Sequence, residues 1–67
     1  MSEIKTVKGI IKGYNSIEVD GEILRAIPMN YIDVKQFFEC ICYVQLQTVE
    51  GGYIILEIIK EEEFELI

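Results

Sequence analysis

The sequence predicts an all-β fold, a small five-stranded barrel of the OB-like type. β-branched and aromatic residues dominate the chain, turn signals recur at short intervals, and helical periodicity is poor. The chain has 67 residues, of which 51% are apolar, and this length allows a single domain. Five short strands with glycines at bends suit a closed or nearly closed barrel, and an SH3-like barrel is the alternative.

The first strand is expected over residues 4–13, IKTVKGIIKG. Alternation places Val7, Gly9 and Ile11 on one face, which we assign to the core. Glycines inside a strand or directly after it, here Gly9 and Gly13, indicate a bend or a bulge. This strand is therefore the one expected to curl the sheet into a barrel.

The clearest local signal is Asp20-Gly21, which lies between two runs of alternating apolar residues. This pair favours positive φ at both central positions, as a two-residue type I′ hairpin requires. Pro28 lacks the amide that would continue the ladder, so the strand before it ends there. We expect the second and third strands at residues 16–19 and 22–27.

The remainder of the barrel is predicted as a short connector followed by a long hairpin. Residues 29–35, MNYIDVK, contain the one plausible helical turn, and the fourth strand runs over residues 36–48. The turn EGG at 50–52 supplies glycine where positive φ is needed, and the fifth strand follows at 53–60. A helical turn between strands three and four favours the OB-like barrel. An SH3-like barrel more often has its short turn between strands four and five.

The chain divides into a barrel domain, residues 1–60, and an acidic tail, residues 61–67. Terminal segments usually fray unless other contacts tie them down, and an acidic tail would then serve mainly to solvate the chain. However, Phe64, Leu66 and Ile67 are apolar side chains that a solvating tail does not need. An interaction segment that docks on a neighbour is therefore the other interpretation of the tail.

Charge and hydropathy narrow the functional classes. The net charge of −6, from 12 acidic and 6 basic residues, disfavours sequence-independent binding to phosphate backbones. The N-terminal stretch MSEIKTVKG has neither the basic start nor the apolar run of a signal peptide. The longest apolar stretches, around 40–46 and 53–59, are too short to span a bilayer. We therefore expect a cytoplasmic protein without membrane association.

No enzyme is predicted, and no cofactor or metal. The chain has no histidine, and two cysteines alone cannot close a four-ligand zinc site. Cys40 and Cys42 are expected to be reduced core thiols, because cysteines one residue apart on a strand lie at the distance limit for an unstrained disulfide. Asp20 and Glu22 superficially suggest a catalytic carboxylate pair. We expect instead that Asp20 is present because it favours the turn and that Glu22 is a solvated surface residue.

The stretch QFFECICYVQLQ, residues 36–47, is apolar on both faces of the predicted strand. The face assigned to the barrel interior carries Phe38, Cys40, Cys42, Val44 and Leu46. The fifth strand has the same character, so apolar side chains also point outward, in a patch larger than monomers usually expose. The side chains predicted to form an interface with a second copy of the chain are Phe37, Ile41, Tyr43, Ile55 and Ile59.

These features predict a non-catalytic protein-interaction module that self-associates as a homodimer and whose acidic surface meets a basic protein partner. Such a module would act as a small subunit or regulator. The alternative is an OB-type protein that binds single-stranded nucleic acid, which the acidic balance disfavours. In that alternative the stacking rings are Tyr43, Phe37 and Tyr53, and the phosphate contacts are Lys8, Lys12 and Arg25.

Overall fold

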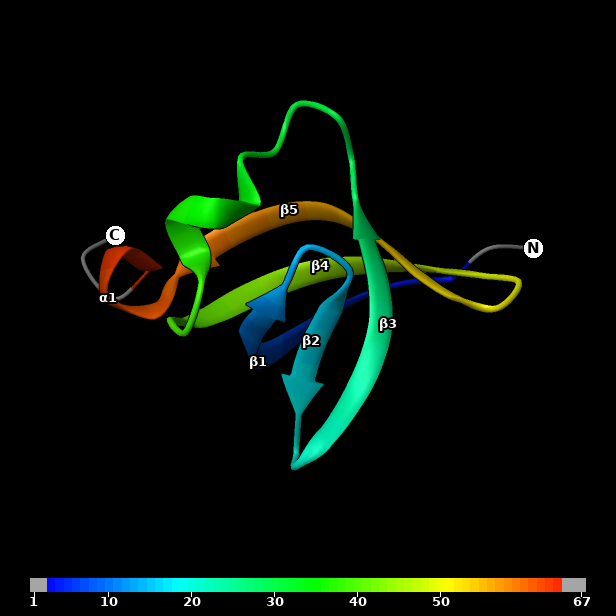
Figure 1. Ribbon diagram of the computed structural model, residues 1–67, viewed down its shortest axis with the longest axis horizontal. Coiled ribbons are helices and arrows are strands. Elements are labelled where there is room, and N and C mark those ends of the chain that lie inside the picture. The colour runs from blue at the N-terminus through cyan, green and yellow to red at the C-terminus, as the bar shows by residue number, and fades with distance from the viewer. Residues whose placement is uncertain (1–2, 65–67) are drawn as a thin grey trace.

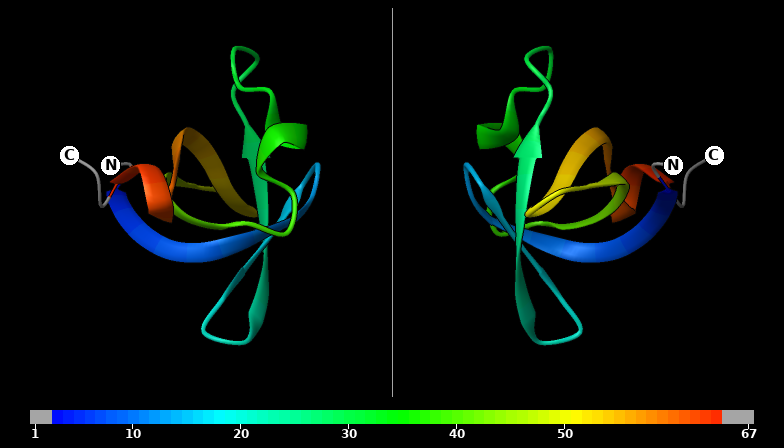
Figure 2. Two further views of the ribbon diagram at one scale, coloured as in Figure 1. Left: turned by 90° about the vertical axis from the view of Figure 1, so that its left-hand side faces the viewer. Right: turned by 90° about the vertical axis from the view of Figure 1, so that its right-hand side faces the viewer.

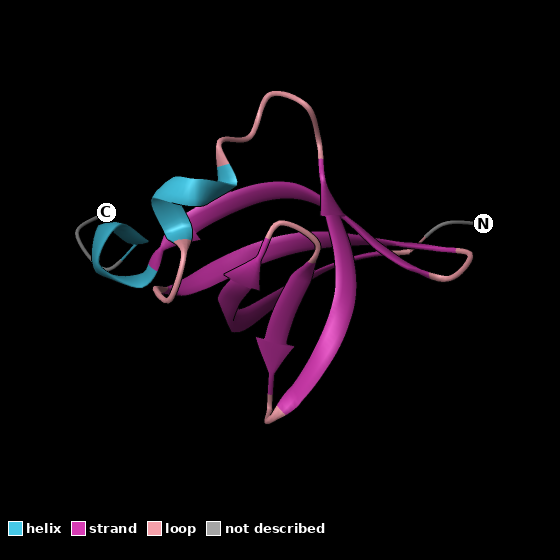
Figure 3. Ribbon diagram, in the orientation of Figure 1, coloured by secondary structure: helices cyan, strands magenta, loops and turns pink. Residues whose placement is uncertain are grey.

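The computed structural model describes residues 3–64, which form a closed five-stranded barrel with two short helical segments (Figure 1, Figure 3). The all-β class and the barrel are therefore as the sequence predicts. The elements are β1 (Ile4–Gly13), β2 (Ser16–Val19), β3 (Glu22–Pro28), the 3₁₀ helix η1 (Val34–Phe37), β4 (Ile41–Val49), β5 (Gly52–Lys60) and the helical turn α1 (Glu61–Phe64).

The strand order around the barrel is β1-β2-β3-β5-β4, and β4 pairs with β1 to close the ring. Every neighbouring pair is antiparallel except β3 and β5, which run parallel where residues 26–28 face residues 53–55. The helical element lies between β3 and β4. This order and this position of the helical turn agree with the OB-like arrangement favoured by the sequence.

Strand β1 belongs to both halves of the barrel. Its residues 4–10 pair with β4, and its residues 10–13 pair with β2 after a change of direction (Figure 2). A Cβ on Gly9 would lie 2.6 Å from the carbonyl oxygen of Glu18. Gly9 is therefore the residue that lets β2 approach β1 at the bend, which agrees with the predicted role of this glycine.

The two hairpin turns follow from local backbone chemistry. Asp20 and Gly21 have φ of 52° and 82°, as a type I′ turn requires, and β2 and β3 flank them at the predicted positions. Strand β3 runs one residue further than predicted and ends with Pro28. Gly51, in the turn between β4 and β5, also has a positive φ, of 85°, and glycine suits this position because a side chain is disfavoured in this conformation.

The core is an apolar cluster drawn from every strand and from η1. The residues of β4 that were assigned to the interior, Cys42, Val44 and Leu46, are all fully buried. Val34 of η1 is buried at one end of the barrel and completes the core there. The buried cluster consists of Ile11, Ile17, Ala26, Val34, Cys42, Val44, Leu46, Ile55 and Ile58.

The start of the predicted fourth strand is wrong. Residues 36–40 are not in a strand: η1 covers Val34–Phe37, and Glu39 has a left-handed φ of 62° that interrupts any alternation. The helical turn also lies later than the predicted 29–35, beginning after Asp33, whose carboxylate accepts a hydrogen bond from Gln36 Nε2 at 3.1 Å. Phe37, Phe38 and Cys40 therefore pack against the core from outside a strand, and the fourth strand is shorter than predicted, Ile41–Val49.

A bulge in β5 changes which of its side chains point inward. The register with β4 shifts so that Gln45 faces Glu57 while Leu46 faces Ile55, which leaves Leu56 as the extra residue. As a result Ile55 is only 1% exposed and lies in the core. The prediction that Ile55 points outward is therefore wrong, because strict alternation fails at the bulge.

Candidate functional site

The outer face of the three strands β1, β4 and β5 is the broadest candidate surface. Cross-strand pairing places side chains of these strands in rows, because directly paired residues point to the same side of a sheet. We call this set the outer sheet face. Its rows are Lys8, Tyr43 and Ile59; Thr6, Gln45 and Glu57; Ile4, Gln47 and Ile54; and Ile10 with Ile41.

The outer sheet face carries several apolar side chains that are exposed or half-buried. Ile41 is 45% exposed, and Ile10, Tyr43 and Ile59 are half-buried beside it. Ile4 is 56% exposed and lies on the far side of the polar row that contains Thr6. A shallow hollow of about 140 Å³ lies between Tyr43, Ile59 and the polar side chains of the neighbouring row. Three of the five predicted interface residues, Ile41, Tyr43 and Ile59, are thus brought together on one face.

The other two predicted interface residues lie elsewhere. Ile55 is in the core, and Phe37 is on η1, where it packs against the core with Lys60 Nζ 6.0 Å from its ring centroid. The sequence reasoning in turn missed Ile4 and Ile10 as members of the face. Alternation along the first strand already puts both on one side, but only the pairing of β1 with β4 shows which surface they join.

The charges on the outer sheet face balance. It carries one cation, Lys8, and one anion, Glu57, so its formal charge is zero in a chain of −6. Lys8 Nζ also forms an ion pair with the Glu61 carboxylate of α1 at 2.5 Å and lies 6.0 Å from the Tyr43 ring centroid. Most of the acidic excess of the protein therefore lies outside this face, although the Glu61 carboxylate meets Lys8 at it.

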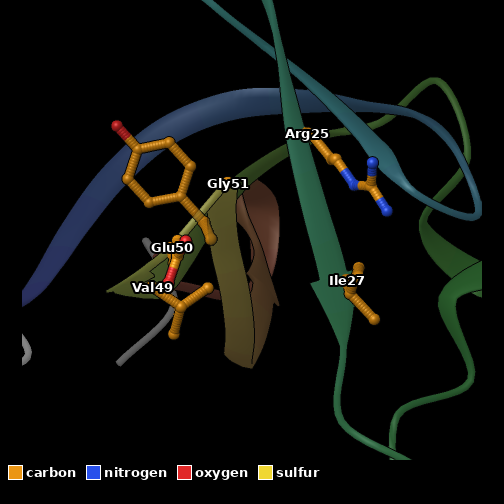
Figure 4. Close-up of a pocket in the computed structure, with 7 residues that line it drawn as sticks. Arg25, Ile27, Val49, Glu50 and Gly51 are labelled. Atoms are coloured by element: carbon orange, nitrogen blue, oxygen red, sulfur yellow. The ribbon is translucent and has the colours of Figure 1, made fainter.

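A second candidate surface lies where β3 meets the β4–β5 hairpin. A hollow of about 220 Å³ is lined by Arg25 and Ile27 of β3 and by residues 49–53 of the hairpin (Figure 4). Glycine at 51 and 52 leaves backbone exposed there, and Tyr53 borders the hollow with Lys5 Nζ 5.0 Å from its ring centroid. We call this hollow the hairpin notch. It unites two residues of the nucleic-acid alternative, Arg25 and Tyr53.

The remaining residues of that alternative have other contacts. Lys12 Nζ lies 3.2 Å from a Glu39 carboxylate oxygen and 3.6 Å from one of Glu18. The hydrogen bond and the charge of Glu39 hold the pKa of Lys12 above its usual value of 10.5. Lys8 is similarly paired with Glu61. A nucleic-acid phosphate would have to compete with these carboxylates for both lysines.

The three proposed stacking rings do not share a surface. Tyr43 lies on the outer sheet face, whereas Tyr53 pairs across the barrel seam with buried Ala26 and packs against the core. Phe37 is on η1. Tyr14 and Phe38 form a ring contact with each other, with centroids 5.2 Å apart in an edge-to-face arrangement. The predicted platform for successive bases is therefore not assembled.

The two thiols, Cys40 and Cys42, lie one residue apart where β4 begins. Both cysteines are free, and burial, followed by the neighbouring Cys40, raises the pKa of the Cys42 thiol to about 11. Cys42 Sγ donates a weak hydrogen bond to the Cys40 carbonyl at 3.4 Å. Within residues 3–64 no group of three or more acidic or cysteine side chains is placed to hold a metal ion. In the same range no helix has the length and apolarity needed to cross a membrane.

Comparison of the chain with protein-family models, curated proteins and solved structures finds no match. The class of the protein is therefore defined by its own fold and surfaces. It is a small closed barrel of five strands with an electrically neutral, partly apolar sheet face on one side and a notch beside the β4–β5 hairpin on another.

Proposed function

We propose that this protein is a non-catalytic interaction module that self-associates through the outer sheet face. The observation that carries the proposal is the exposure of Ile41 next to half-buried Ile10, Tyr43 and Ile59 on three adjacent strands, with exposed Ile4 beyond the polar row of the same face. Water contact with a patch of this kind is unfavourable, and covering it gains roughly 25 cal/mol for each Å² of apolar surface.

The charge distribution supports a second copy of the chain as the occupant of this face. Two molecules of charge −6 repel, so the contact that brings them together is best made where neither carries excess charge. The outer sheet face satisfies this condition with Lys8 and Glu57. In a two-fold dimer each side chain of the patch meets the same patch on its partner, so Lys8 of one copy can approach Glu57 of the other.

The free thiols of the protein fit a reducing cellular compartment. Cys40 and Cys42 are free thiols, and Cys40 is only half-buried. Thiols of this kind persist in the cytoplasm, where glutathione and thioredoxin keep them reduced. A cytoplasmic small subunit or regulator is therefore the form of the proposal that we carry forward.

Light scattering of the wild-type protein and of Ile41→Glu tests the proposal. The wild-type chain is expected to have the mass of a dimer, and Ile41→Glu the mass of a monomer, because the new carboxylate is buried without a partner at the interface. The dimer should persist or strengthen between about 0.05 and about 0.5 M salt, since salt screens the repulsion between two acidic molecules.

Met29→Glu is the matched control. Met29 is 38% exposed in the connector after β3, outside the outer sheet face, so this variant should remain a dimer. A wild-type monomer at all salt concentrations would contradict the proposal. Equal dissociation of both variants would mean that the interface lies elsewhere.

A further inference from the structure

The edge of β3 that faces away from β2 is open over part of its length. Residues 22–25 pair with β2 on one edge, but pairing with β5 on the other edge covers only residues 26–28. Within the described chain, residues 22–25 therefore have no strand partner on the second edge. An edge of this kind is a template for another strand, because alternate amide and carbonyl groups point outward from it.

The hairpin notch begins where this open edge ends. Arg25 and Ile27 of β3 line one side of the notch, and Val49 and Glu50 line the other (Figure 4). Gly52 makes the junction close, since a Cβ there would lie 2.7 Å from the Arg25 carbonyl oxygen. A segment paired with the open edge would thus run directly into a hollow of about 220 Å³.

The side chains along the open edge of β3 favour the binding of another strand. Ile23 is 60% exposed and Ile27 is 45% exposed, so the outer side of β3 offers apolar contacts on either side of Arg25. Residues 4–8 of β1 form a further open edge, which is different because Lys5 and Lys8 lie on it. Lysines on an edge strand oppose pairing with another chain. The edge of β3 is therefore the more receptive of the two.

The charges around the edge indicate the kind of partner. Asp20, Glu22 and Glu50 lie at the turn, at the start of β3 and at the notch, and Arg25 is the one cation among them. Their formal sum is −2, and it is −1 when Lys5, whose Nζ lies 5.0 Å from the ring centroid of Tyr53 at the notch, is counted as well. An approaching segment with positive charge is therefore attracted, and an acidic one, including a second copy of this chain, is repelled.

We propose that the open edge of β3 binds an extended, basic segment of a partner protein by strand addition, with an apolar side chain of that segment seated in the hairpin notch. The site borders the outer sheet face, since Ile27 pairs with Ile54, but strand addition uses the backbone of β3 and does not require the dimer. Main-chain hydrogen bonds to Ile23 and to the Arg25 amide supply affinity, since residues 22 and 24 bond toward β2 and β5 covers the Arg25 carbonyl. The notch supplies selectivity for the side chain at one position.

The test is an NMR titration of the full-length protein with a peptide of about seven residues in which lysine and valine alternate. Binding should shift the amide resonances of residues 22–27 and 49–53 and slow hydrogen exchange at Ile23 and Arg25. A glutamate–valine peptide should bind at least roughly tenfold more weakly, because it reverses the charge attraction. Equal binding of the acidic peptide would overturn the proposal.

Backbone pairing is tested with two further lysine–valine peptides, one N-methylated at every valine and the other at every lysine. Strand addition uses the amides of alternate residues, so only one of these peptides should lose binding. Retention of binding by both, or oligothymidylate binding to the same amides in place of the peptide, would overturn the proposal.

Charge-reversed variants provide an independent readout. Glu22→Lys combined with Glu50→Lys should weaken the lysine–valine peptide roughly tenfold. Glu62→Lys, an exposed change on α1 away from the edge, should leave its affinity within about twofold. An equal effect of the double variant and this control would show attraction to the whole acidic surface and not to the edge.

Discussion

At the scale of single residues, two glycines determine how closely neighbouring strands of the barrel approach each other. A Cβ at Gly9 would meet the Glu18 carbonyl oxygen at 2.6 Å, and one at Gly52 would meet the Arg25 carbonyl oxygen at 2.7 Å. Both obstacles are backbone atoms of a neighbouring strand, which cannot move aside without breaking the ladder. Glycine is needed at these positions for space and not only for conformational freedom.

Gly9→Ala is therefore expected to lower the free energy of unfolding by about 1–3 kcal/mol, as overpacking of a closed interior does. The measurement is the urea midpoint of the purified variant. Gly13→Ala is the control, because its nearest obstacle is the Ser16 hydroxyl at 3.2 Å, a side-chain atom that can rotate. Equal loss of stability in both variants would show that the close approach at Gly9 is not the cause.

The Cys42 thiol makes stability depend on pH in the alkaline range. Its pKa is raised from 9.0 to about 11 in the folded protein, chiefly by burial. Below the lower value the thiol is neutral in both states, and its full contribution to stability is present. As pH rises toward the folded value, the unfolded chain releases the proton first, so the free energy of unfolding falls.

The expected result is a loss of stability between about pH 8 and about pH 10 that is smaller in Cys42→Ala than in the wild-type protein. Chemical denaturation at both pH values measures it. Tyrosines and lysines also titrate in this range, but they are common to both proteins and cancel in the comparison. An identical pH dependence in the two proteins would mean that Cys42 ionises equally in the folded and unfolded states.

At the scale of elements, turns could be predicted from the sequence, whereas the segment before β4 could not. Asp20-Gly21 specifies its hairpin through positive φ at both residues, which is a local property. Phe37 and Phe38 have strand-like composition, yet they lie in η1 and directly after it. Their conformation is decided by packing against the core, and tertiary contacts of this kind override strand propensity.

Tyr31 connects the segment between β3 and η1 to the barrel by a hydrogen bond. Its hydroxyl donates a hydrogen bond to the Leu56 carbonyl at 2.6 Å, at the bulged residue of β5, although the side chain is 71% exposed. Tyr31→Phe should lower the free energy of unfolding by no more than about 1 kcal/mol. Amide exchange of residues 29–33 should become faster, while exchange in β4 stays unchanged. Unchanged exchange in the connector would show that other contacts hold it.

At the scale of the whole molecule, the class and the number of strands followed from composition and turn spacing. The membership of the candidate surfaces did not. Ile41, Tyr43 and Ile59 were found by alternation within their own strands, but Ile4 and Ile10 required the pairing of β1 with β4. The bulge between β4 and β5 reversed the prediction for Ile55, because one extra residue changes the phase of every side chain beyond it.

The residues of the hairpin notch also could not be predicted from the sequence. Arg25 and Tyr53 were both singled out in the sequence, but they are brought together by the parallel pairing of β3 with β5, which joins distant parts of the chain. Local patterns carry no information about such a pairing. It is also the pairing that leaves residues 22–25 with one open edge.

The parallel seam between β3 and β5 has a topological consequence. It is the one parallel pairing in the ring, and it spans only residues 26–28 and 53–55. If these pairs separate, the remaining strands form an open ribbon in the order β3-β2-β1-β4-β5, with each of the four antiparallel ladders intact. The closed ring and the open ribbon therefore differ by a single short seam, and the two ends of that ribbon are the strands that line the hairpin notch.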